Sequence, residues 1–253
     1  MVETGLAMPH KNVFYPESKF GGFSNIDGTL AFYLRVNALL VPSSIVLDFG
    51  CGRGGYQEDP ILIRRDLRIL KGKASKVIGL DINPAAGDNP YIDEFIPLES
   101  DQWPVEDRSA DLVVCDNVLE HLKDPGYFFI EAQRVLRSGG HVCIRTPNSW
   151  NYIAIISRLI PNKYHSKVTA AVQDNRKEQD VFPTYYRCNT VLKVRAMLNE
   201  HGFHNSVVYG YEAEPSYLSF SKVAYYFGVL HQKIAPNFLK ATVIAFGKKD
   251  AHG

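Results

Sequence analysis

The chain has 253 residues, of which 45% are hydrophobic and 22% are charged, as in ordinary globular proteins and unlike disordered chains. Its formal net charge of +1 gives no overall attraction for nucleic acid, so we expect no nucleic-acid partner. No uninterrupted apolar run approaches the roughly 18 residues of a membrane span, and the length fits one large α/β domain.

The four cysteines, Cys51, Cys115, Cys143 and Cys188, lie far apart and form no C-x-x-C pair. This spacing predicts neither a disulfide framework nor a metal site, and it favours a reducing, cytoplasmic setting. The N-terminus lacks a basic region followed by an apolar core, so we expect no signal peptide.

The first 43 residues are rich in aromatic side chains and in glycine turns. Helical spacing of apolar residues from Thr29 predicts a helix up to Leu40, which Pro42 ends. This segment is either a cap over a ligand site or a helix packed against the core.

Residues 45–55, with the sequence IVLDFGCGRGG, combine a short apolar run with a string of glycines. The run predicts a buried strand, and the glycines allow positive φ angles and a close backbone approach to a ligand. A helix is expected soon after the turn, so backbone N–H groups there could hold a phosphate or a carboxylate.

Strand and helix patterns then alternate along the chain. Apolar runs predict further strands at residues 76–81, 95–98, 110–116 and 140–145, and a helix at residues 125–136. The alternation predicts a parallel sheet with helices on both faces. The basic residues between the first two strands, Arg64, Arg65, Arg68, Lys71, Lys73 and Lys76, have the spacing of a solvated helix face.

Acidic or polar residues follow four of the predicted strands, at Asp48, Asp81, Glu99 to Asp101, and Asp116 with Asn117. Ligands of parallel α/β sheets bind beyond the carboxyl ends of the strands. A carboxylate can accept hydrogen bonds from two hydroxyls at once, so Asp81 is a candidate for holding a ribose diol. A turn or N-cap role before Pro84 is the alternative for Asp81.

The order of these motifs resembles the class I S-adenosylmethionine-dependent methyltransferases, of methyltransferase type 11 or 23, over roughly residues 44–148. The resemblance is carried by LDFGCGRG at residues 47–54, VIGLD at 77–81, and SADLVV at 109–114 with NVLEHLKDP at 117–125. EAQRVLRSGG at 131–140 is similar to the stretch that leads into the fifth strand. The combination of motifs is specific, whereas each motif alone is not.

The resemblance implies a Rossmann-like, doubly wound, seven-stranded sheet with an antiparallel last strand, whose final strands would lie at residues 205–209 and 241–246. It also implies S-adenosylmethionine as the cofactor and a small-molecule acceptor. The glycine turn would face the methionine part, Asp81 the ribose, Glu99 or Asp101 the adenine, and Asp116 with Asn117 the methionine end. The full set of cofactor residues expected from the match is Asp48, Gly50, Cys51, Gly52, Gly54, Asp81, Ile82, Glu99, Asp101, Asp116 and Asn117.

Asp81 lies 33 residues after Asp48, which indicates a long helix between the first two strands. A nicotinamide or flavin enzyme is the competing interpretation, since Gly50, Gly52 and Gly55 satisfy G-x-G-x-x-G. Dinucleotide-binding units place their acid about 20 residues past the glycines, however, which is nearer than Asp81. A non-catalytic protein that keeps the cofactor fold is a third hypothesis.

If the acceptor is a hydroxyl, a base must remove its proton, and His121 after the fourth strand is the candidate. Its alternative role is to brace the loop. His165 and residues 185–187 are rival candidates.

An insert at residues 149–189, with a helix at 150–159, is expected to shape the acceptor site together with the N-terminal cap at 1–43. The core would then span 44–148, and 190–253 would hold the last helix and strands of a single domain. Candidate substrate contacts are Arg145, Asn148, Tyr185, Tyr186 and Arg187.

The stretches at residues 20–33 and 182–184 resemble bacterial methyltransferases of glycan biosynthesis, which points to O-methylation of a saccharide or sugar nucleotide. A phenol or quinone acceptor is the alternative. The apolar stretches at 152–160 and 223–230 are expected to cover the core or a substrate pocket rather than to lie on a membrane. Either a monomer or a homodimer is compatible with the sequence.

Overall fold

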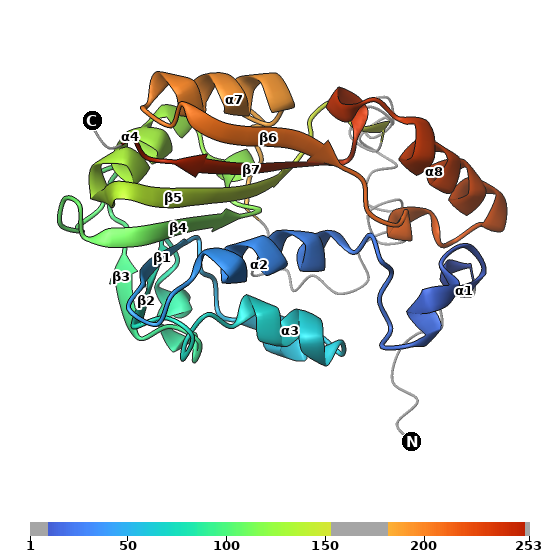
Figure 1. The fold of residues 1–253 in the computed structure, drawn as a ribbon, viewed down its shortest axis with the longest axis horizontal. Helices are drawn as coiled ribbons and strands as arrows, with labels where there is room; N and C mark the ends of the chain where they lie inside the picture. Colours follow the sequence, from blue (N-terminus) through green and yellow to red (C-terminus); the bar gives the residue numbers. More distant parts are fainter. Residues whose placement is uncertain (1–9, 153–181, 251–253) are drawn as a thin grey trace.

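The computed structural model describes residues 10–152 and 182–250, and its centre is one seven-stranded sheet (Figure 1). The strands run in the order β3-β2-β1-β4-β5-β7-β6. Their bounds are β1 Ile45–Phe49, β2 Lys76–Asp81, β3 Glu94–Pro97, β4 Ala110–Asp116, β5 Leu136–Pro147, β6 Asn205–Tyr211 and β7 Thr242–Lys248. Strands β1 to β5 pair in parallel, and β7 is antiparallel to both β5 and β6. The predicted Rossmann-like, doubly wound sheet with an antiparallel last strand is confirmed.

Helices cover both faces of the sheet, because alternate apolar side chains along β1 point to opposite faces. Leu47 and Phe49 pack with α4 (Pro125–Val135) and α7 (Val191–Glu200), whereas Val46 packs with α2 (Gly28–Leu39). Successive strand residues point to opposite faces, so a buried central strand needs apolar residues at both parities. Phe32, Phe128 and Phe129 are fully buried on these faces, and each contributes about 1.5–3 kcal/mol through burial.

The link from β1 to β2 differs from the long helix expected there. The glycine turn leads into a single 3-10 turn, η2 (Gly55–Glu58), and the helix α3 (Leu62–Arg68) has only 7 residues. Asp59 and Pro60 separate the two because the chain turns to extended backbone at Asp59. A helix therefore does not start directly after the glycines.

The basic residues of α3 were expected to face solvent, and this prediction is wrong for Arg64 and Arg68. Arg64 donates hydrogen bonds to Asp59 and Asp27, and the Arg68 guanidinium stacks 4.7 Å from the Tyr56 ring. These two arginines are half-buried, because each lies against an acid or an aromatic ring from another segment.

Two further elements lie at one end of the molecule, α1 (Lys11–Phe14) and α8 (Lys222–Ile234), which follows the 3-10 turn η6 (Ser216–Leu218) (Figure 1). Tyr225 and Val229 of α8 are buried, but Val223, Tyr226, Phe227 and Leu230 are 41–66% exposed. The expectation that residues 223–230 cover the core therefore holds for one face of this helix and is wrong for the other. Among the described residues, no helix combines the length and apolarity that crossing a bilayer requires. Most of the predicted helix at 150–159 lies outside the described residues.

Candidate active site

The strand order reverses between β1 and β4, and this switch point is where ligands of open α/β sheets bind. The glycine turn after β1 lies there, with positive φ angles at Gly50, Gly52 and Gly54. A Cβ on Gly50 would lie 2.3 Å from the Val118 side chain, so the turn packs directly on the segment after β4. Only glycine satisfies both the backbone conformation and this contact.

Asn89 supports the glycine turn through hydrogen bonds, a role that the sequence pattern did not predict. It is 4% exposed, and its Nδ2 donates to the carbonyls of Cys51 and Gly52 at 3.1 and 3.0 Å. The Cys51 side chain is buried, and a Cβ on Gly79 of β2 would lie 2.6 Å from its Sγ. Cys51, a predicted cofactor residue, therefore offers only its backbone to a ligand.

Asp81, at the end of β2, lies beside the turn. Its two oxygens accept the N–H groups of Gly52 at 3.0 Å and Asn83 at 2.8 Å. A carboxylate has about four acceptor positions, so one position on each oxygen remains for a ligand hydroxyl. These two remaining acceptor positions fit the two hydroxyls of a ribose. The neighbouring Ile82 is 66% exposed, as a residue under an adenine ring would be. Glu99 and Asp101 are exposed after β3.

Asp116, at the end of β4, has a structural partner on each oxygen. Arg145 of β5 donates to it through Nε at 2.6 Å and through its terminal nitrogen at 2.7 Å, and Tyr33 of α2 donates at 2.9 Å. Asn117 Nδ2 donates to it as well, at 2.9 Å. Burial alone would raise the pKa of Asp116, but the charge and hydrogen bonds of Arg145 outweigh burial and lower that pKa. We therefore assign Asp116 the task of orienting Arg145, Tyr33 and Asn117 rather than a direct cofactor contact.

Asp48 has a different electrostatic environment from Asp116. Burial and the nearby charges of Asp116 and Asp81 raise its pKa to about 7, although Arg68 partly offsets them. A positively charged ligand beside Asp48 would favour the ionised carboxylate. The sequence placed Asp48 at this site but did not indicate Arg68, whose Nε is buried without a hydrogen-bond partner.

His121 lies in the 3-10 turn η4 (Leu119–His121), with its Nδ1 2.8 Å from the Pro183 carbonyl. A carbonyl only accepts, so Nδ1 carries the hydrogen and Nε2 of the neutral ring is the acceptor. The neighbouring Glu120 is buried, which raises its pKa, and it accepts the hydroxyl of Thr146 at 2.9 Å. The Glu120 carbonyl accepts the N–H of Tyr185 at 2.7 Å, which fixes the end of the insert next to His121.

The predicted substrate residues do not form one group. Asn148 is fully buried and donates to the carbonyls of Phe238 and Lys240, both at 2.8 Å. It therefore anchors a loop, in place of the predicted substrate contact. Tyr185 and Arg187 are exposed, Tyr186 has a positive φ angle, and Arg145 is 8% exposed in its ion pair with Asp116. His165 lies outside the described residues.

A polar cavity of about 280 Å³ opens beside the end of β4. Its wall combines the start of α2, the ends of β4 and β5, the start of β7 and the segment before α8, through Asp27, Gly28, Thr29, Arg64, Asn117, Arg145, Ala213, Glu214, Ser216 and Thr242. We call it the polar pocket. Hydroxyl, amide, carboxylate and guanidinium groups dominate its wall, so it suits a ligand with several hydrogen-bonding groups.

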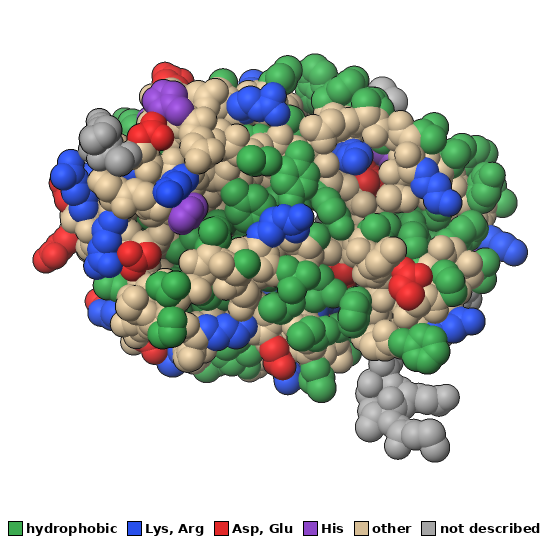
Figure 2. All heavy atoms as spheres, viewed as in Figure 1, with side chains coloured by type: hydrophobic (Ala, Val, Ile, Leu, Met, Phe, Trp, Pro, Cys, Tyr) green, Lys and Arg blue, Asp and Glu red, His purple; other side chains and the backbone are tan. Residues whose placement is uncertain are grey.

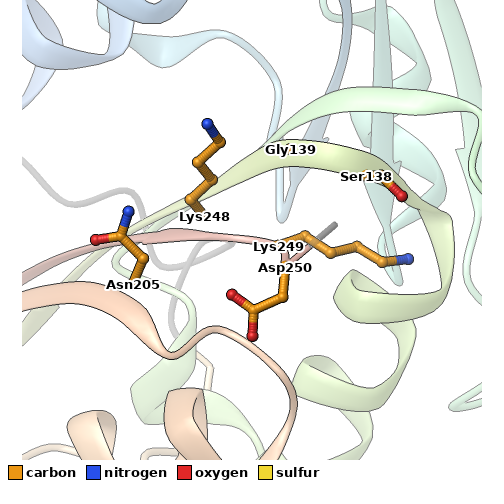
Figure 3. Close-up of a pocket in the computed structure, with 6 residues that line it drawn as sticks. All are labelled: Ser138, Gly139, Asn205, Lys248, Lys249 and Asp250. Carbon is orange, nitrogen blue, oxygen red and sulfur yellow. The ribbon is translucent and has the colours of Figure 1, made fainter. Parts of the chain in front are cut away.

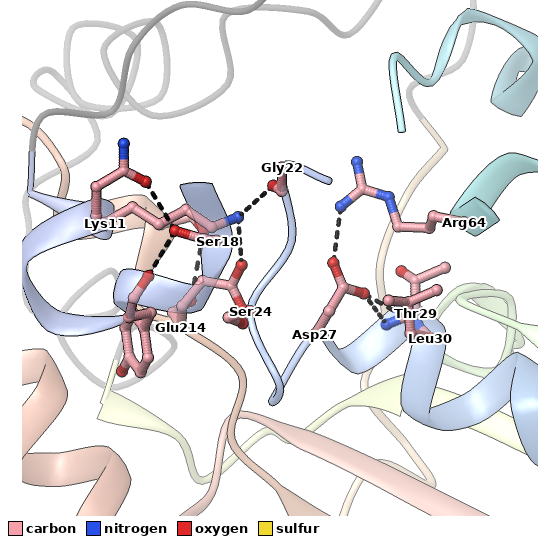
Figure 4. A network of polar contacts seen from close by, with 12 residues as sticks. Lys11, Ser18, Gly22, Ser24, Asp27, Thr29, Leu30, Arg64 and Glu214 are labelled. Carbon is pink, nitrogen blue, oxygen red and sulfur yellow. Dashed lines mark hydrogen bonds and ion pairs between the residues drawn. The ribbon is translucent and has the colours of Figure 1, made fainter. Parts of the chain in front are cut away.

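Hydrogen bonds and ion pairs fix the wall of the polar pocket (Figure 4). Asp27 caps α2 by accepting from the N–H groups of Thr29 and Leu30, both at 2.9 Å, and it pairs with Arg64 at 2.8 Å. Glu214 accepts the Ser24 hydroxyl at 2.7 Å and pairs with Lys11 at 2.8 Å. The N-terminal segment is thereby attached to both α3 and the segment before α8.

A second cavity, of about 300 Å³, lies at the opposite edge of the sheet (Figure 3). Its wall includes Ser138 and Gly139 near the start of β5 and Lys248 at the end of the antiparallel β7. This is the amino edge of the parallel strands, where ligands of such sheets do not bind. Among the described residues, no group of three or more His, Cys, Asp or Glu side chains could hold a metal ion.

Comparisons with known proteins agree with this geometry. A probable S-adenosylmethionine-dependent methyltransferase of Mycolicibacterium smegmatis is 36% identical over 108 residues, which cover 41% of this chain and 38% of that protein. A ubiquinone biosynthesis O-methyltransferase of Nitrosomonas europaea is 28% identical over 162 residues, covering 59% of this chain and 67% of that protein. The chain thus spans between about a third and two thirds of these curated relatives.

Solved structures of low sequence identity share the fold. The crystal structure of a SAM-dependent methyltransferase from Archaeoglobus fulgidus aligns with a TM-score of 0.53 at 19% identity, over 92% of this chain and 97% of that one. A chain in the complex between the Haloferax volcanii Trm112 methyltransferase activator and a putative methyltransferase gives a TM-score of 0.56 at 17% identity, over 98% and 99% of the two chains.

The family model described as "Methyltransferase domain" matches residues 27–205, which is more than half of the chain. With the relatives above, this match confirms the predicted cofactor, S-adenosylmethionine. The chain belongs to the methyltransferase domain family, within the class I S-adenosylmethionine-dependent methyltransferases.

Proposed function

We propose that the protein transfers the methyl group of S-adenosylmethionine to a hydroxyl of a saccharide or sugar nucleotide held in the polar pocket. The observation that carries this proposal is the composition of the wall, where Thr29, Asn117, Ser216 and Thr242 offer neutral hydrogen-bonding groups. A polyhydroxylated acceptor matches such a mixture of donors and acceptors better than an apolar ring does.

The cofactor would lie over the glycine turn, with its ribose at Asp81. S-adenosylmethionine supplies an electrophilic methyl group, so the protein mainly orients the acceptor and excludes water. Asn117 follows β4 and lines the polar pocket, and the next residue, Val118, contacts the glycine turn. These contacts support a position of the acceptor beside the methionine end of the cofactor. In this proposal, residues 1–43 and 149–189 frame the acceptor and residues 44–148 hold the cofactor.

His121 is our candidate for the base that takes the proton of the acceptor hydroxyl. The Pro183 carbonyl holds its hydrogen on Nδ1, so Nε2, which lies 3.8 Å from Glu120 Oε1, is the nitrogen that accepts a proton. We expect His121→Ala to lower kcat by about a hundredfold or more, since general bases contribute about 10²–10⁴-fold. Cofactor affinity should not change. His121 does not line the polar pocket, so a loss of kcat below tenfold would instead assign it to bracing the loop.

The test of the acceptor class is a methyl-transfer screen over sugars, sugar nucleotides, phenols and quinone precursors, with products identified by mass. We expect a gain of one methyl group on a saccharide. Ser216→Leu should fill the polar pocket and raise the KM for the acceptor at least tenfold while leaving the affinity for S-adenosylhomocysteine unchanged. Ser138→Leu, in the cavity at the opposite edge, is the matched control.

A phenol or quinone precursor is the second candidate, favoured by the relatives named ubiquinone biosynthesis O-methyltransferase. Methylation of phenols alone in the screen would select it. Stabilisation by NAD(H) but not by S-adenosylhomocysteine would contradict both candidates, since a ligand at a hundredfold excess over its Kd should stabilise its own protein by about 2.7 kcal/mol. Cofactor binding without turnover on any acceptor would favour a non-catalytic role.

A further inference from the structure

The helix α8 has two apolar faces, and only one of them is packed. Tyr225, Gly228 and Val229 are buried against the rest of the molecule. Val223, Tyr226, Phe227, Leu230 and Ile234 follow the spacing i, i+3, i+4, i+7 and i+11, which places them on one stripe of a helix. They are 66%, 54%, 61%, 41% and 70% exposed, respectively. We call these five residues the outer stripe.

More exposed apolar side chains precede and follow α8 along the chain. Tyr217 and Phe220 precede the helix and are 51% and 68% exposed, and Phe238 follows it and is 47% exposed. Hydrophobic side chains gather at the end of the molecule where α8 lies, with Lys and Arg side chains among them (Figure 2). A contiguous apolar surface of this kind is unusual on a protein that contacts only water.

Lysines border the outer stripe within α8, and on the other flank His231 lies 3.7 Å from Glu212. Residues 215–249 contain no Asp or Glu, whereas they contain five lysines and one histidine. On a helical projection, Lys222 and Lys233 fall on the same flank of the outer stripe and His231 on the other. Lysines can extend their charge away from an apolar surface that they border.

We propose that the outer stripe inserts into the interfacial layer of an anionic membrane, so that α8 lies in the plane of the surface. An apolar, aromatic face bordered by lysines is the pattern of helices that bind membrane interfaces. A second copy of the chain is a poorer occupant, because a two-fold contact would bring the lysines of both copies together while the neighbouring Glu212 already lies beside His231. Anionic head groups supply the compensating charge.

This proposal is independent of the methyl acceptor, since none of the outer-stripe residues lines the polar pocket. The pocket residue Ser216 lies six residues before the start of α8, however. A membrane-bound α8 would therefore keep the polar pocket close to the head-group region.

The test is co-sedimentation of the full chain with vesicles of phosphatidylcholine alone and of phosphatidylcholine with about one third phosphatidylglycerol. We expect binding to the anionic vesicles at 0.1 M salt and much weaker binding at 0.5 M salt, because salt screens surface charge. Phe227→Glu should lower the vesicle affinity at least tenfold, and Lys222→Gln or Lys233→Gln about fivefold each. Phe227→Trp should show a blue-shifted emission when anionic vesicles are added.

The matched control is Leu192→Glu on α7, a residue that is also 66% exposed on a helix but lies away from α8. It should bind vesicles like the unmodified chain, and both glutamate variants should keep their affinity for S-adenosylhomocysteine. Absence of vesicle binding, or binding that Phe227→Glu does not weaken, would overturn the proposal. So would a dimer in light scattering that Phe227→Glu dissociates, since a second copy would then cover the outer stripe.

Discussion

Asp81 carries the clearest prediction for a single residue. Its oxygens each accept one backbone N–H and retain one acceptor position. Two charge-assisted hydrogen bonds to a ribose contribute about 1.5–3 kcal/mol each, so Asp81→Ala should weaken S-adenosylhomocysteine binding at least a hundredfold in calorimetry. Asp88→Ala, which removes an exposed acid seven residues further on, should leave the affinity unchanged. Equal affinities of both variants would contradict the assignment of Asp81.

Asp48 predicts how cofactor binding depends on pH. Its pKa of about 7 in the unliganded protein means that the carboxylate is largely protonated at pH 6 and ionised at pH 8. The cofactor carries positive charge and favours the ionised form, so its affinity should rise about tenfold from pH 6 to pH 8. Calorimetric titration of S-adenosylmethionine itself across this range measures the effect, and Asp48→Asn should flatten the profile.

The same shift has a stability consequence of opposite sign. The folded protein holds a proton on Asp48 that the unfolded chain, with a pKa near 3.9, has released. The free energy of unfolding therefore falls as pH rises from about 4 to 7, and Asp48→Asn should stabilise the unliganded protein at pH 8. A loss of stability of the Asp48→Asn variant at pH 8 would show that Arg68 stabilises the ionised Asp48 more than burial destabilises it.

Residue types alone located Asp48, Asp81 and Asp116, because acids at the ends of apolar strands are conspicuous in a sequence. They did not reveal the partners of these acids. Tyr33 lies 83 residues before Asp116, and Arg68 stacks on aromatic rings from two different segments. Such pairings depend on how the helices pack on the sheet, which periodicity does not specify.

At the scale of elements, the glycine turn gives a prediction with an internal control. Gly50→Ala would place a Cβ 2.3 Å from Val118 at a φ angle of +71°. Overpacking costs about 1–3 kcal/mol, and the left-handed conformation costs about 1–2 kcal/mol more. We expect a decrease of at least about 2 kcal/mol in the free energy of unfolding, measured with urea.

Gly55→Ala is the matched control for Gly50→Ala. No heavy atom would lie within 4 Å of its Cβ, and its φ angle is not positive. This substitution should be neutral or stabilising by about 0.4–1 kcal/mol. Adding Val118→Ala to Gly50→Ala should recover the packing loss but not the backbone strain. Full recovery would mean that the φ angle of Gly50 is not required.

The elements themselves were largely predictable. All seven strands coincide with apolar runs, so the sequence pattern predicts their positions. The antiparallel last strand, which is also confirmed, was implied by the family resemblance and not by the runs. The link through η2 and α3 was not predicted, because the long interval before Asp81 suggested one continuous helix. The helix α8 was seen only as a short apolar stretch, because apolar side chains lie on both its packed and its exposed face and the sequence does not indicate which face packs.

At the scale of the whole molecule, one buried ion pair connects the N-terminal segment to the sheet. Arg145 of β5 binds Asp116 of β4, and Arg145 also donates to Thr29 of α2 at 2.8 Å. Tyr33 of the same helix donates to Asp116 at 2.9 Å. The start of α2, which lines the polar pocket, is thus held by the same charges that connect β4 to β5. The first 43 residues were expected either to cap a ligand site or to pack on the core, and α2 does both. It packs on the sheet through Phe32 and Val36, and it lines the polar pocket through Gly28 and Thr29.

This arrangement predicts a large and non-additive effect on stability. The side chains of Arg145 and Asp116 are 9% and 8% exposed, so Asp116→Ala would leave a buried guanidinium without its partner. Such a loss costs about 3–5 kcal/mol, whereas replacing both partners by apolar residues of similar volume is often close to neutral. Asp116→Leu combined with Arg145→Met should accordingly be more stable to urea than Asp116→Ala alone.

The pH dependence and a mutant cycle test the same pair. Because the pKa of Asp116 is lowered in the folded state, its stabilising contribution is present above about pH 4 and is lost as pH falls further.

Tyr33→Phe should cost about 1 kcal/mol in the unmodified chain and much less when Asp116 is already alanine, since the tyrosine hydroxyl then has no carboxylate to bind. Additive losses in this cycle would show that α2 is attached to the sheet by its apolar face alone. Coupling of about 0.5 kcal/mol or more would show that the polar pocket, α2 and the sheet share one electrostatic connection.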